Sequence, residues 1–235
     1  PDKNWLKKML LPFPDPSIVG TEPWAFTYRK QAGFVERYSA LIGANDPYAF
    51  IVGVSDRINY INHHWTSLPL HQTDQGKYLK VTLKPNQTIP TIGANGTIFK
   101  TNFIKDNLKS DYLFDIDLIQ QVINQTQKPL YFAKVKTGII HTYCESSVKK
   151  FIRKQNRRLI DYYQYQDQRQ YNWSQTHRFG IIKFVFHTIF ISPFLSIIGF
   201  LKKPDFAWFF HPLACCLSLF VYSSVTIKHQ LNLQK

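Results

Sequence analysis

Cysteine is scarce in this chain of 235 residues, which contains Cys144, Cys215 and Cys216 and no Cys-x-x-Cys pair. This spacing excludes the disulfide framework of a small secreted domain and also excludes a zinc finger. The sequence contains no phosphate-binding P-loop, no nucleophile elbow and no His-Glu-x-x-His motif, so three common classes of catalytic site are absent. Because the three cysteines lack disulfide spacing, we expect a thiol-tolerant protein that faces the cytoplasm.

Acidic residues are also few, because 15 Asp and Glu stand against 29 Lys and Arg, and the formal net charge is +14. Residues 1–133 carry a net +3, residues 134–178 carry +7, and residues 179–235 carry +4. Basic proteins often bind nucleic acid, but these basic residues adjoin apolar runs and do not alternate with aromatic residues. We expect no nucleic-acid partner, and we expect membrane lipids as a partner instead.

Two apolar runs lie near the C-terminus, at 179–201 and 206–227, and Lys202-Lys203-Pro204-Asp205 connects them. Each run has about the 20 residues that cross a hydrocarbon core as a helix. We predict a transmembrane helical hairpin, with the basic block 149–178 on the cytoplasmic side. The two lysines of the connection oppose the positive-inside rule. A pair of buried helices and a hairpin lying in the membrane interface therefore remain as alternatives.

A basic amphipathic helix is predicted over 145–163, directly before the apolar runs. An apolar stripe lies opposite two basic rows at i, i+4 spacing. The stripe contains Val148, Ile152, Leu159 and Tyr163, and the rows are Lys149-Arg153-Arg157 and Lys150-Lys154-Arg158. Aligned like charges destabilise an isolated helix, which indicates an anionic neighbour. Lipid headgroups and a diphosphate in an active site are both candidates, and a solvated face is the third possibility.

Elements of both kinds alternate before this helix, which indicates an α/β fold. We predict helices at 4–11, 30–41 and 112–124, a helix start near Thr101, and strands at 77–83, 130–136 and 139–141. Asp111 is the expected cap of the helix at 112–124. We divide the chain into an α/β part at 1–144, a basic juxtamembrane helix region at 145–178 and a membrane hairpin with its tail at 179–235.

Four short motifs follow one another in a fixed order along the chain. They are Pro-Thr-Ile-Gly-Ala-Asn-Gly at 90–96, Phe-Asp-Ile-Asp-Leu at 114–118, Ile-Ile-His at 139–141, and a helix containing Arg157-Arg158 before the apolar runs. This order resembles the second half of a family 2 glycosyltransferase of the GT-A type. Phe114 stands where that family often has Glu. The resemblance implies the acceptor-side half of a GT-A domain, followed by a transmembrane or interfacial helical hairpin.

The resemblance also implies roles for individual residues. Asp115 matches the carboxylate that takes the proton from the acceptor hydroxyl in an inverting transfer. Gly93, Ala94, Asn95 and Gly96 match the loop beside the donor sugar. Asp117 is expected to orient the acceptor or to cap the helix. His141 matches the late ligand of the divalent cation, Mg²⁺ or Mn²⁺, and Arg157 and Arg158 are expected to neutralise the diphosphate.

The function implied is the transfer of a sugar from a nucleotide-sugar donor to a lipid-linked or cell-envelope glycan acceptor at the cytoplasmic face of a membrane. A GT-A enzyme also needs a nucleotide-binding half, which precedes these motifs in the family. We therefore expect this chain to be a C-terminal fragment of a glycosyltransferase, inactive by itself. The alternative is a non-catalytic membrane-surface module that binds anionic lipid through its basic helix.

Overall fold

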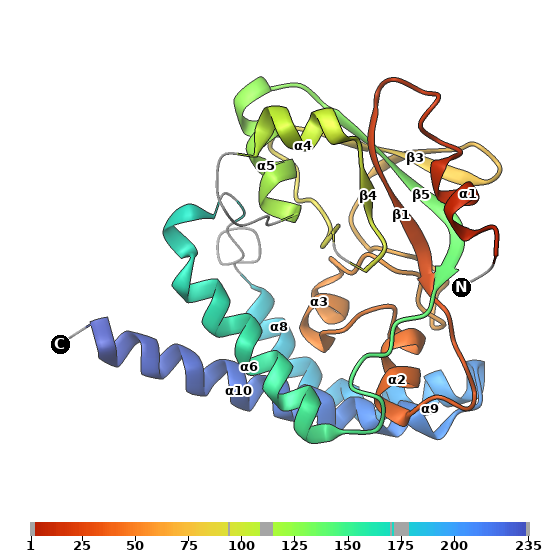
Figure 1. Cartoon of the computed structure of the whole chain (residues 1–235). Helices are drawn as coiled ribbons and strands as arrows, with labels where there is room; N and C mark the ends of the chain where they lie inside the picture. Colours follow the sequence, from red (N-terminus) through yellow and green to blue (C-terminus); the bar gives the residue numbers. More distant parts are fainter. Residues whose placement is uncertain (1–2, 94, 109–114, 170, 172–178, 234–235) are drawn as a thin grey trace.

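The computed structural model describes residues 3–93, 95–108, 115–169, 171 and 179–233. These residues form a mixed α/β body built on one sheet, and a pair of long helical arms lies along the base of that body (Figure 1). The α/β class expected from the sequence and the two apolar helical segments are both present.

The sheet has five strands in the order β2-β3-β5-β1-β4. The two central strands, β1 and β5, are parallel, and the pairs β3–β5, β2–β3 and β1–β4 are antiparallel. The strands are β1 (Ile18–Phe26), β2 (His71–Asp74), β3 (Tyr78–Leu83), β4 (Ile98–Phe99) and β5 (Leu130–Ile139). Because β1 and β5 run in the same direction, their carboxyl ends meet at one edge of the sheet.

Seven helical segments accompany the sheet in the part before the apolar arms that the structure describes. They are α1 (Trp5–Leu10), α2 (Phe34–Ile42), α3 (Pro47–Val52), α4 (Thr101–Asn107), α5 (Asp115–Thr126), α6 (Val148–Gln164) and the short 3₁₀ turn η1 (Gln166–Gln168). Ile116, Ile119 and Ile123 of α5 are buried against Phe132 of β5 in one apolar cluster. Because the three isoleucines are spaced three and four residues apart, they share one face of the helix, and this face packs on the sheet.

The helix that the basic rows predicted is α6, and it begins three residues later than expected. The Ser147 hydroxyl accepts a hydrogen bond from the Lys150 backbone N–H at 3.2 Å, which caps the first turn. The fully buried side chains of α6 are Phe151 and Gln155, whereas the predicted stripe residue Val148 is only partly buried. The apolar stripe is therefore shifted around the helix from its predicted position.

The predicted strands at 77–83 and 130–141 correspond to β3 and β5, and the helix start near Thr101 is confirmed. The predicted start of the next helix, including Asp111, falls at 109–114 and lies outside the described residues. The sequence did not predict β1, because Gly20 and Pro23 interrupt it and the polar residues Thr21 and Glu22 are buried in it. β2 was also missed, since all four of its residues are exposed.

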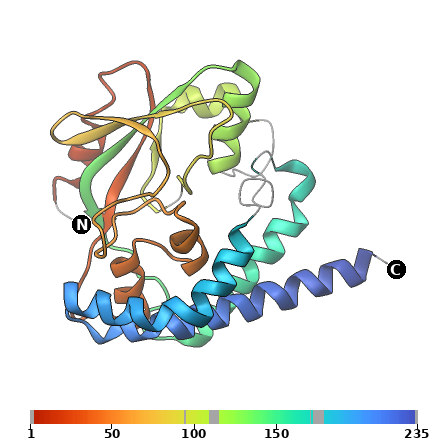
Figure 2. The ribbon, with the colours of Figure 1, turned by 180° about the vertical axis from the view of Figure 1, so that it is seen from behind.

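The apolar arms form a hairpin along the base of the body (Figure 2). The first arm contains α8 (Gly180–Phe186), a π-helical turn η2 (His187–Ile191) and α9 (Ser192–Lys202); the second contains a 3₁₀ turn η3 (Phe206–Phe209) and α10 (Phe210–Leu233). Gly180–Lys202 and Phe206–Leu231 are each long and apolar enough to cross a membrane. In the apolar 18-residue stretch of each segment, 33% and 39% of the residues are buried, so most of each stretch is not enclosed by the rest of the described chain.

One apolar cluster joins the three segments into which the sequence was divided. Tyr38 of α2, Tyr143 after β5, Phe151 of α6, and Trp208 and Phe210 of the second arm are all members of it. The hairpin is therefore packed into the core of the α/β body and is not a separate appendage.

Candidate functional site

The loop at 93–96 lies against the start of α5. Gly93 has a φ of +141°, and a Cβ added to it would lie 2.3 Å from the Cβ of Asp115. Only glycine therefore allows this close approach of the loop backbone to the aspartate. Gly96 is similarly close to Ile139 at the end of β5. Two of the sequence-predicted motifs thus meet in space, whereas Ala94 of the same loop lies outside the described residues.

A buried ionic cluster of Glu22, Asp56, Arg57 and Lys134 holds this loop in place. The Glu22 carboxylate of β1, fully buried, accepts hydrogen bonds from the Gly93 backbone N–H and from the Thr97 hydroxyl, both at 3.1 Å. The same carboxylate lies 2.8 Å from the Arg57 guanidinium and 2.6 Å from the Lys134 ammonium of β5. The loop position is therefore fixed by charge-assisted hydrogen bonds inside the sheet.

The charges of this cluster are balanced by two carboxylates. Asp56 pairs with Arg57 at 2.6 Å, and its carbonyl oxygen accepts from Lys134. Burial acts to raise the pKa of Glu22, but Arg57 and Lys134 outweigh it and hold that pKa below its ordinary value. Burial lowers the pKa of Lys134 to about 8, although Glu22 acts in the opposite direction. Glu22 therefore carries the negative charge on which the loop rests.

His141 lies beside this cluster, just beyond the end of β5. Its ring stacks on two aromatic rings, with centroid distances of 5.1 Å to Phe26 and 5.6 Å to Tyr143. The Arg57 guanidinium lies over the Phe26 ring, 5.2 Å from its centroid. Burial, with smaller effects from the Lys154 and Arg57 cations, lowers the pKa of His141 to about 4. Its Nε2 is buried and has no hydrogen-bond partner among the described residues. A neutral imidazole with a free lone pair is a competent metal ligand.

Asp117 has structural partners that the sequence did not predict. Its carboxylate is buried, pairs with Arg169 at 3.0 Å and accepts a hydrogen bond from the Tyr171 backbone N–H at 2.8 Å. These contacts tie the segment after α6 to the first turn of α5. Among the described residues, the hydrogen-bond partners of Asp117 are therefore on this segment.

The two arginines expected to bind a diphosphate have different surroundings. Arg157 is 76% exposed, and its nearest acidic partner is Asp161 at 3.9 Å. Arg158 pairs with Asp46 at 3.2 Å and donates to the Gln155 side chain at 2.7 Å. Lys154 lies 4.5 Å from the centre of the Tyr143 ring, which itself stacks on His141. Through this contact Lys154, a member of the second basic row, is linked to His141.

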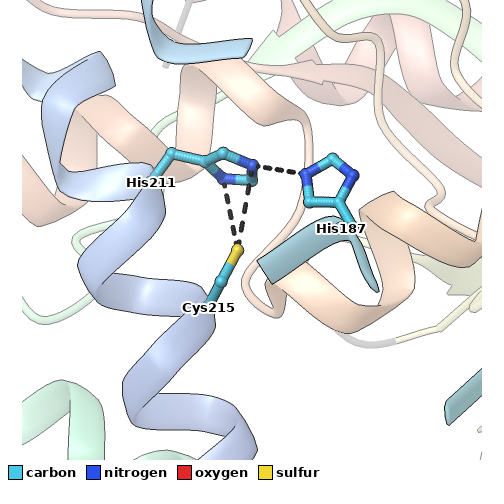
Figure 3. Close-up of side chains that lie close together, drawn as sticks. All are labelled: His187, His211 and Cys215. Atoms are coloured by element: carbon cyan, nitrogen blue, oxygen red, sulfur yellow. Dashed lines mark hydrogen bonds between the residues drawn. The ribbon is translucent and has the colours of Figure 1, made fainter. Parts of the chain in front are cut away.

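A second group of side chains with ligand atoms lies inside the hairpin (Figure 3). His187 Nε2 and His211 Nε2 are 3.0 Å apart, and Cys215 Sγ is 3.8 Å from both ring nitrogens of His211. All three residues are buried. A search of the described residues for three or more histidine, cysteine or acidic side chains close enough to hold one metal ion finds this group.

Comparison of the chain with models of protein families, with curated proteins and with solved structures gave no match. The functional reading therefore depends on the geometry described above.

Proposed function

We propose that the chain is the acceptor-side part of a membrane-associated inverting glycosyltransferase. It would act with a nucleotide-binding half to move a sugar from a nucleotide donor to a lipid-linked or cell-envelope glycan acceptor. The observation that carries the proposal is the contact of the Gly93 backbone with Asp115 at the start of α5. A loop that can approach a sugar and a carboxylate that can take a proton from an acceptor hydroxyl are thereby held side by side.

An inverting sugar transfer requires one general base within hydrogen-bonding distance of the acceptor hydroxyl. Asp115 is that base in the proposal, and the N-terminal end of α5 stabilises its carboxylate form. Glu22 holds the Gly93 backbone N–H, which would set the distance between sugar and base before substrates arrive. His141 Nε2 would hold a divalent cation, Mg²⁺ or Mn²⁺. A cation held there would supply positive charge for the diphosphate of the donor.

Substitution of Asp115 in the complete enzyme tests this proposal. Asp115→Asn should reduce turnover by about 10²-fold or more, because a general base contributes that much, and it should leave nucleotide-sugar binding intact. Turnover with purified acceptor lipid and calorimetric titration with a uridine or guanosine diphosphate sugar give the two readouts. Asp106→Asn, on the exposed surface of the neighbouring helix α4, is the matched control.

Retained turnover in Asp115→Asn would remove the residue from the mechanism. The 235 residues alone should bind no nucleotide sugar and transfer none. Sugar transfer by this chain in isolation would contradict the proposed dependence on a nucleotide-binding half.

A second function, docking to a membrane surface, is favoured by the distribution of side chains on the hairpin. The outward face of both arms is almost entirely large and apolar, and several of its residues are more than two-thirds exposed. These residues are Phe179, Ile181, Ile182, Phe194, Leu201, Phe206 and Phe220. The inward face instead contains small polar residues. Thr188, Ser192 and Ser196 are buried, and each hydroxyl donates to the carbonyl four residues earlier.

This inside-out pattern is the one expected where hydrocarbon surrounds a helix. A second copy of the chain is a poor occupant of the same face, because both copies carry a net charge of +14. Anionic lipid headgroups complement the basic residues that flank the apolar face, including Lys183, Lys202 and Lys228. A bilayer containing anionic lipid is therefore the occupant that the charges favour.

The turn of the hairpin is tied to the α/β body. Lys202 donates to the Ile61 carbonyl oxygen at 2.7 Å, and Asp205 accepts from the Tyr28 hydroxyl at 2.5 Å and from Arg37 at 2.9 Å. A hairpin whose arms crossed the bilayer would hold this turn on the far side, away from the body. The contacts therefore favour arms that lie in one leaflet, parallel to the membrane surface.

The contacts of α10 support the same orientation along its length. His211 bonds to Tyr38 of α2 near one end, and Thr226 lies 2.8 Å from the Tyr163 hydroxyl of α6 near the other. Fifteen residues of helix span about 22 Å. If α10 crossed the bilayer, α6 with its exposed basic rows would have to enter the hydrocarbon beside it, which is strongly unfavourable.

Site-directed labelling from each side of the membrane tests this orientation. In a Cys216→Ser background, which removes the exposed native thiol, Lys202→Cys at the turn, Lys228→Cys on α10 and Lys77→Cys on the α/β body each introduce one exposed thiol. An arrangement within one leaflet makes all three react with an impermeant maleimide from the same side of sealed vesicles, the cytoplasmic side. A spanning hairpin would make position 202 react from the opposite side. Recovery of the protein in the soluble fraction without detergent would contradict membrane docking altogether.

A further inference from the structure

The buried His187, His211 and Cys215 side chains carry an inference that neither proposed function uses. We propose that these residues bind one thiophilic d¹⁰ metal ion, Zn²⁺ or Cu⁺, which joins the two arms of the hairpin. The two nitrogens and the sulfur lie within 4.8 Å of one another and converge from different helices. His187 comes from the first arm, whereas His211 and Cys215 are four residues apart on α10 and share one face.

The distances are close to those of a metal site. Tetrahedral coordination with Zn–N bonds of about 2.05 Å and Zn–S bonds of about 2.3 Å separates two nitrogens by about 3.4 Å and a nitrogen from sulfur by about 3.6 Å. The corresponding separations here are 3.0 Å and 3.8 Å. The third separation, between His187 Nε2 and Cys215 Sγ, is no more than 4.8 Å, so side-chain rotations would bring the three atoms to bonding distance of one ion.

Tyr38 orients one of these ligands. Its hydroxyl lies 2.7 Å from His211 Nδ1, which leaves Nε2 of the same ring directed toward His187. Metal-bound histidines regularly have such a partner on the ring nitrogen that does not bind the metal. His187 itself lies at the start of the π-helical turn η2, a distortion that is frequent at functional sites.

The donor set selects the kind of ion. A thiolate and two imidazoles suit zinc and copper, whereas Mg²⁺ and Ca²⁺ require oxygen ligands. When the ion binds, Cys215 loses its thiol proton to solvent and a sulfur–metal bond forms. The thiolate charge then offsets the charge of the ion, fully for Cu⁺ and in part for Zn²⁺, as a buried site requires.

A matched pair of adjacent cysteines provides the test. The full chain, produced with an affinity tag that contains no histidine, is purified in detergent, and its zinc and copper are measured by mass spectrometry. We expect one ion per chain in the native protein and in Cys216→Ser, because Cys216 is exposed and outside the cluster. We expect loss of the ion in Cys215→Ser. The element found distinguishes zinc from copper.

Equal metal content in the two variants, or no bound metal in the folded native protein, would overturn the proposal. A measurement on the native sequence covers the case in which Cys215→Ser does not fold. Cobalt(II) added to the metal-free protein should produce a thiolate-to-cobalt charge-transfer band and should protect Cys215 from alkylation. Tyr38→Phe should weaken cobalt binding by about 10- to 100-fold, as loss of such an orienting partner does. Absence of the band would mean that the cluster is a hydrogen-bonded histidine pair.

Discussion

His141 combines a buried, unpartnered ring nitrogen with a pKa that burial lowers to about 4. At a pH between about 4 and the ordinary pKa of 6.5, His141 binds a proton in the unfolded chain but not in the folded chain. The folded protein should therefore lose stability as the pH falls from about 6.5 to about 4. His141→Phe keeps the ring stack with Phe26 and Tyr143, and it should remove this part of the pH dependence.

Thermal unfolding in detergent across that pH range measures the effect. Parallel stability curves for the native protein and His141→Phe would contradict the prediction. If His141 is also the cation ligand of the complete glycosyltransferase, the same variant lowers turnover while it leaves stability at neutral pH unchanged. Stability and activity therefore report on the two roles separately.

Glu22 is the shared partner of Arg57 and Lys134 inside the sheet. Glu22→Gln leaves two buried cations with Asp56 as their carboxylate partner, and loss of a buried ion-pair partner costs about 3–5 kcal/mol. We expect urea unfolding to show a decrease of that size in the free energy of unfolding. The double variant Glu22→Gln/Lys134→Met should recover part of it. A decrease no larger than that of a surface substitution would show that the cluster does not hold the loop.

These buried charges also show where residue-level reasoning from the sequence stops. The glycine loop, Asp115 and His141 were predicted as site residues because each belongs to a local motif. Glu22, Arg57 and Lys134 belong to no motif, and their function depends on contacts between residues more than 30 positions apart. The signal present in the sequence was a charged residue within each of two apolar strands.

At the scale of one element, Gly199 determines how closely the two arms of the hairpin approach. A Cβ at this position would lie 2.4 Å from the ring of Trp208, which is fully buried and has no room to move. Gly199→Ala should therefore destabilise the protein by about 1–3 kcal/mol, the usual cost of overpacking. Ile198→Ala, on the exposed outer face of the same helix, should change stability by less than about 0.5 kcal/mol.

Thermal unfolding in detergent compares these two neighbouring substitutions. A stability of Gly199→Ala equal to that of the native protein would contradict the close packing of α9 on η3. In a vesicle flotation assay we expect the opposite order. Ile198→Ala should weaken vesicle binding more than Gly199→Ala does, because it removes apolar surface that we expect to contact lipid.

Helices and strands whose apolar residues recur with a clear period were predicted from the sequence, and those without such a period were not. The 3.6-residue apolar pattern predicted α5 and α6, and alternation predicted β3. β1 has no alternation because both of its faces are covered, and its glycine and proline resemble turn signals. The orientation of the hairpin also depends on contacts at Ile61, Tyr28 and Tyr163, about which its own apolar sequence carries no information.

For the molecule as a whole, the proposed one-leaflet docking predicts that salt does not release the protein from vesicles. Raising the salt to about 1 M shortens the Debye length to about 3 Å and screens headgroup attraction, but it does not weaken apolar burial. Protein bound to vesicles containing anionic lipid should remain bound in a flotation assay after this treatment. Release by salt would mean that the basic helix α6 alone provides the attachment.

The shared core of body and hairpin has a consequence for synthesis of the protein. Tyr38 and Phe151 are made before Trp208 and Phe210, the residues that cover them in the shared core. The α/β body therefore cannot complete its folding before the hairpin is available. If the hairpin seats in the leaflet, the last folding step occurs at the bilayer, and a chain that misses the membrane remains unfinished and exposed to proteases.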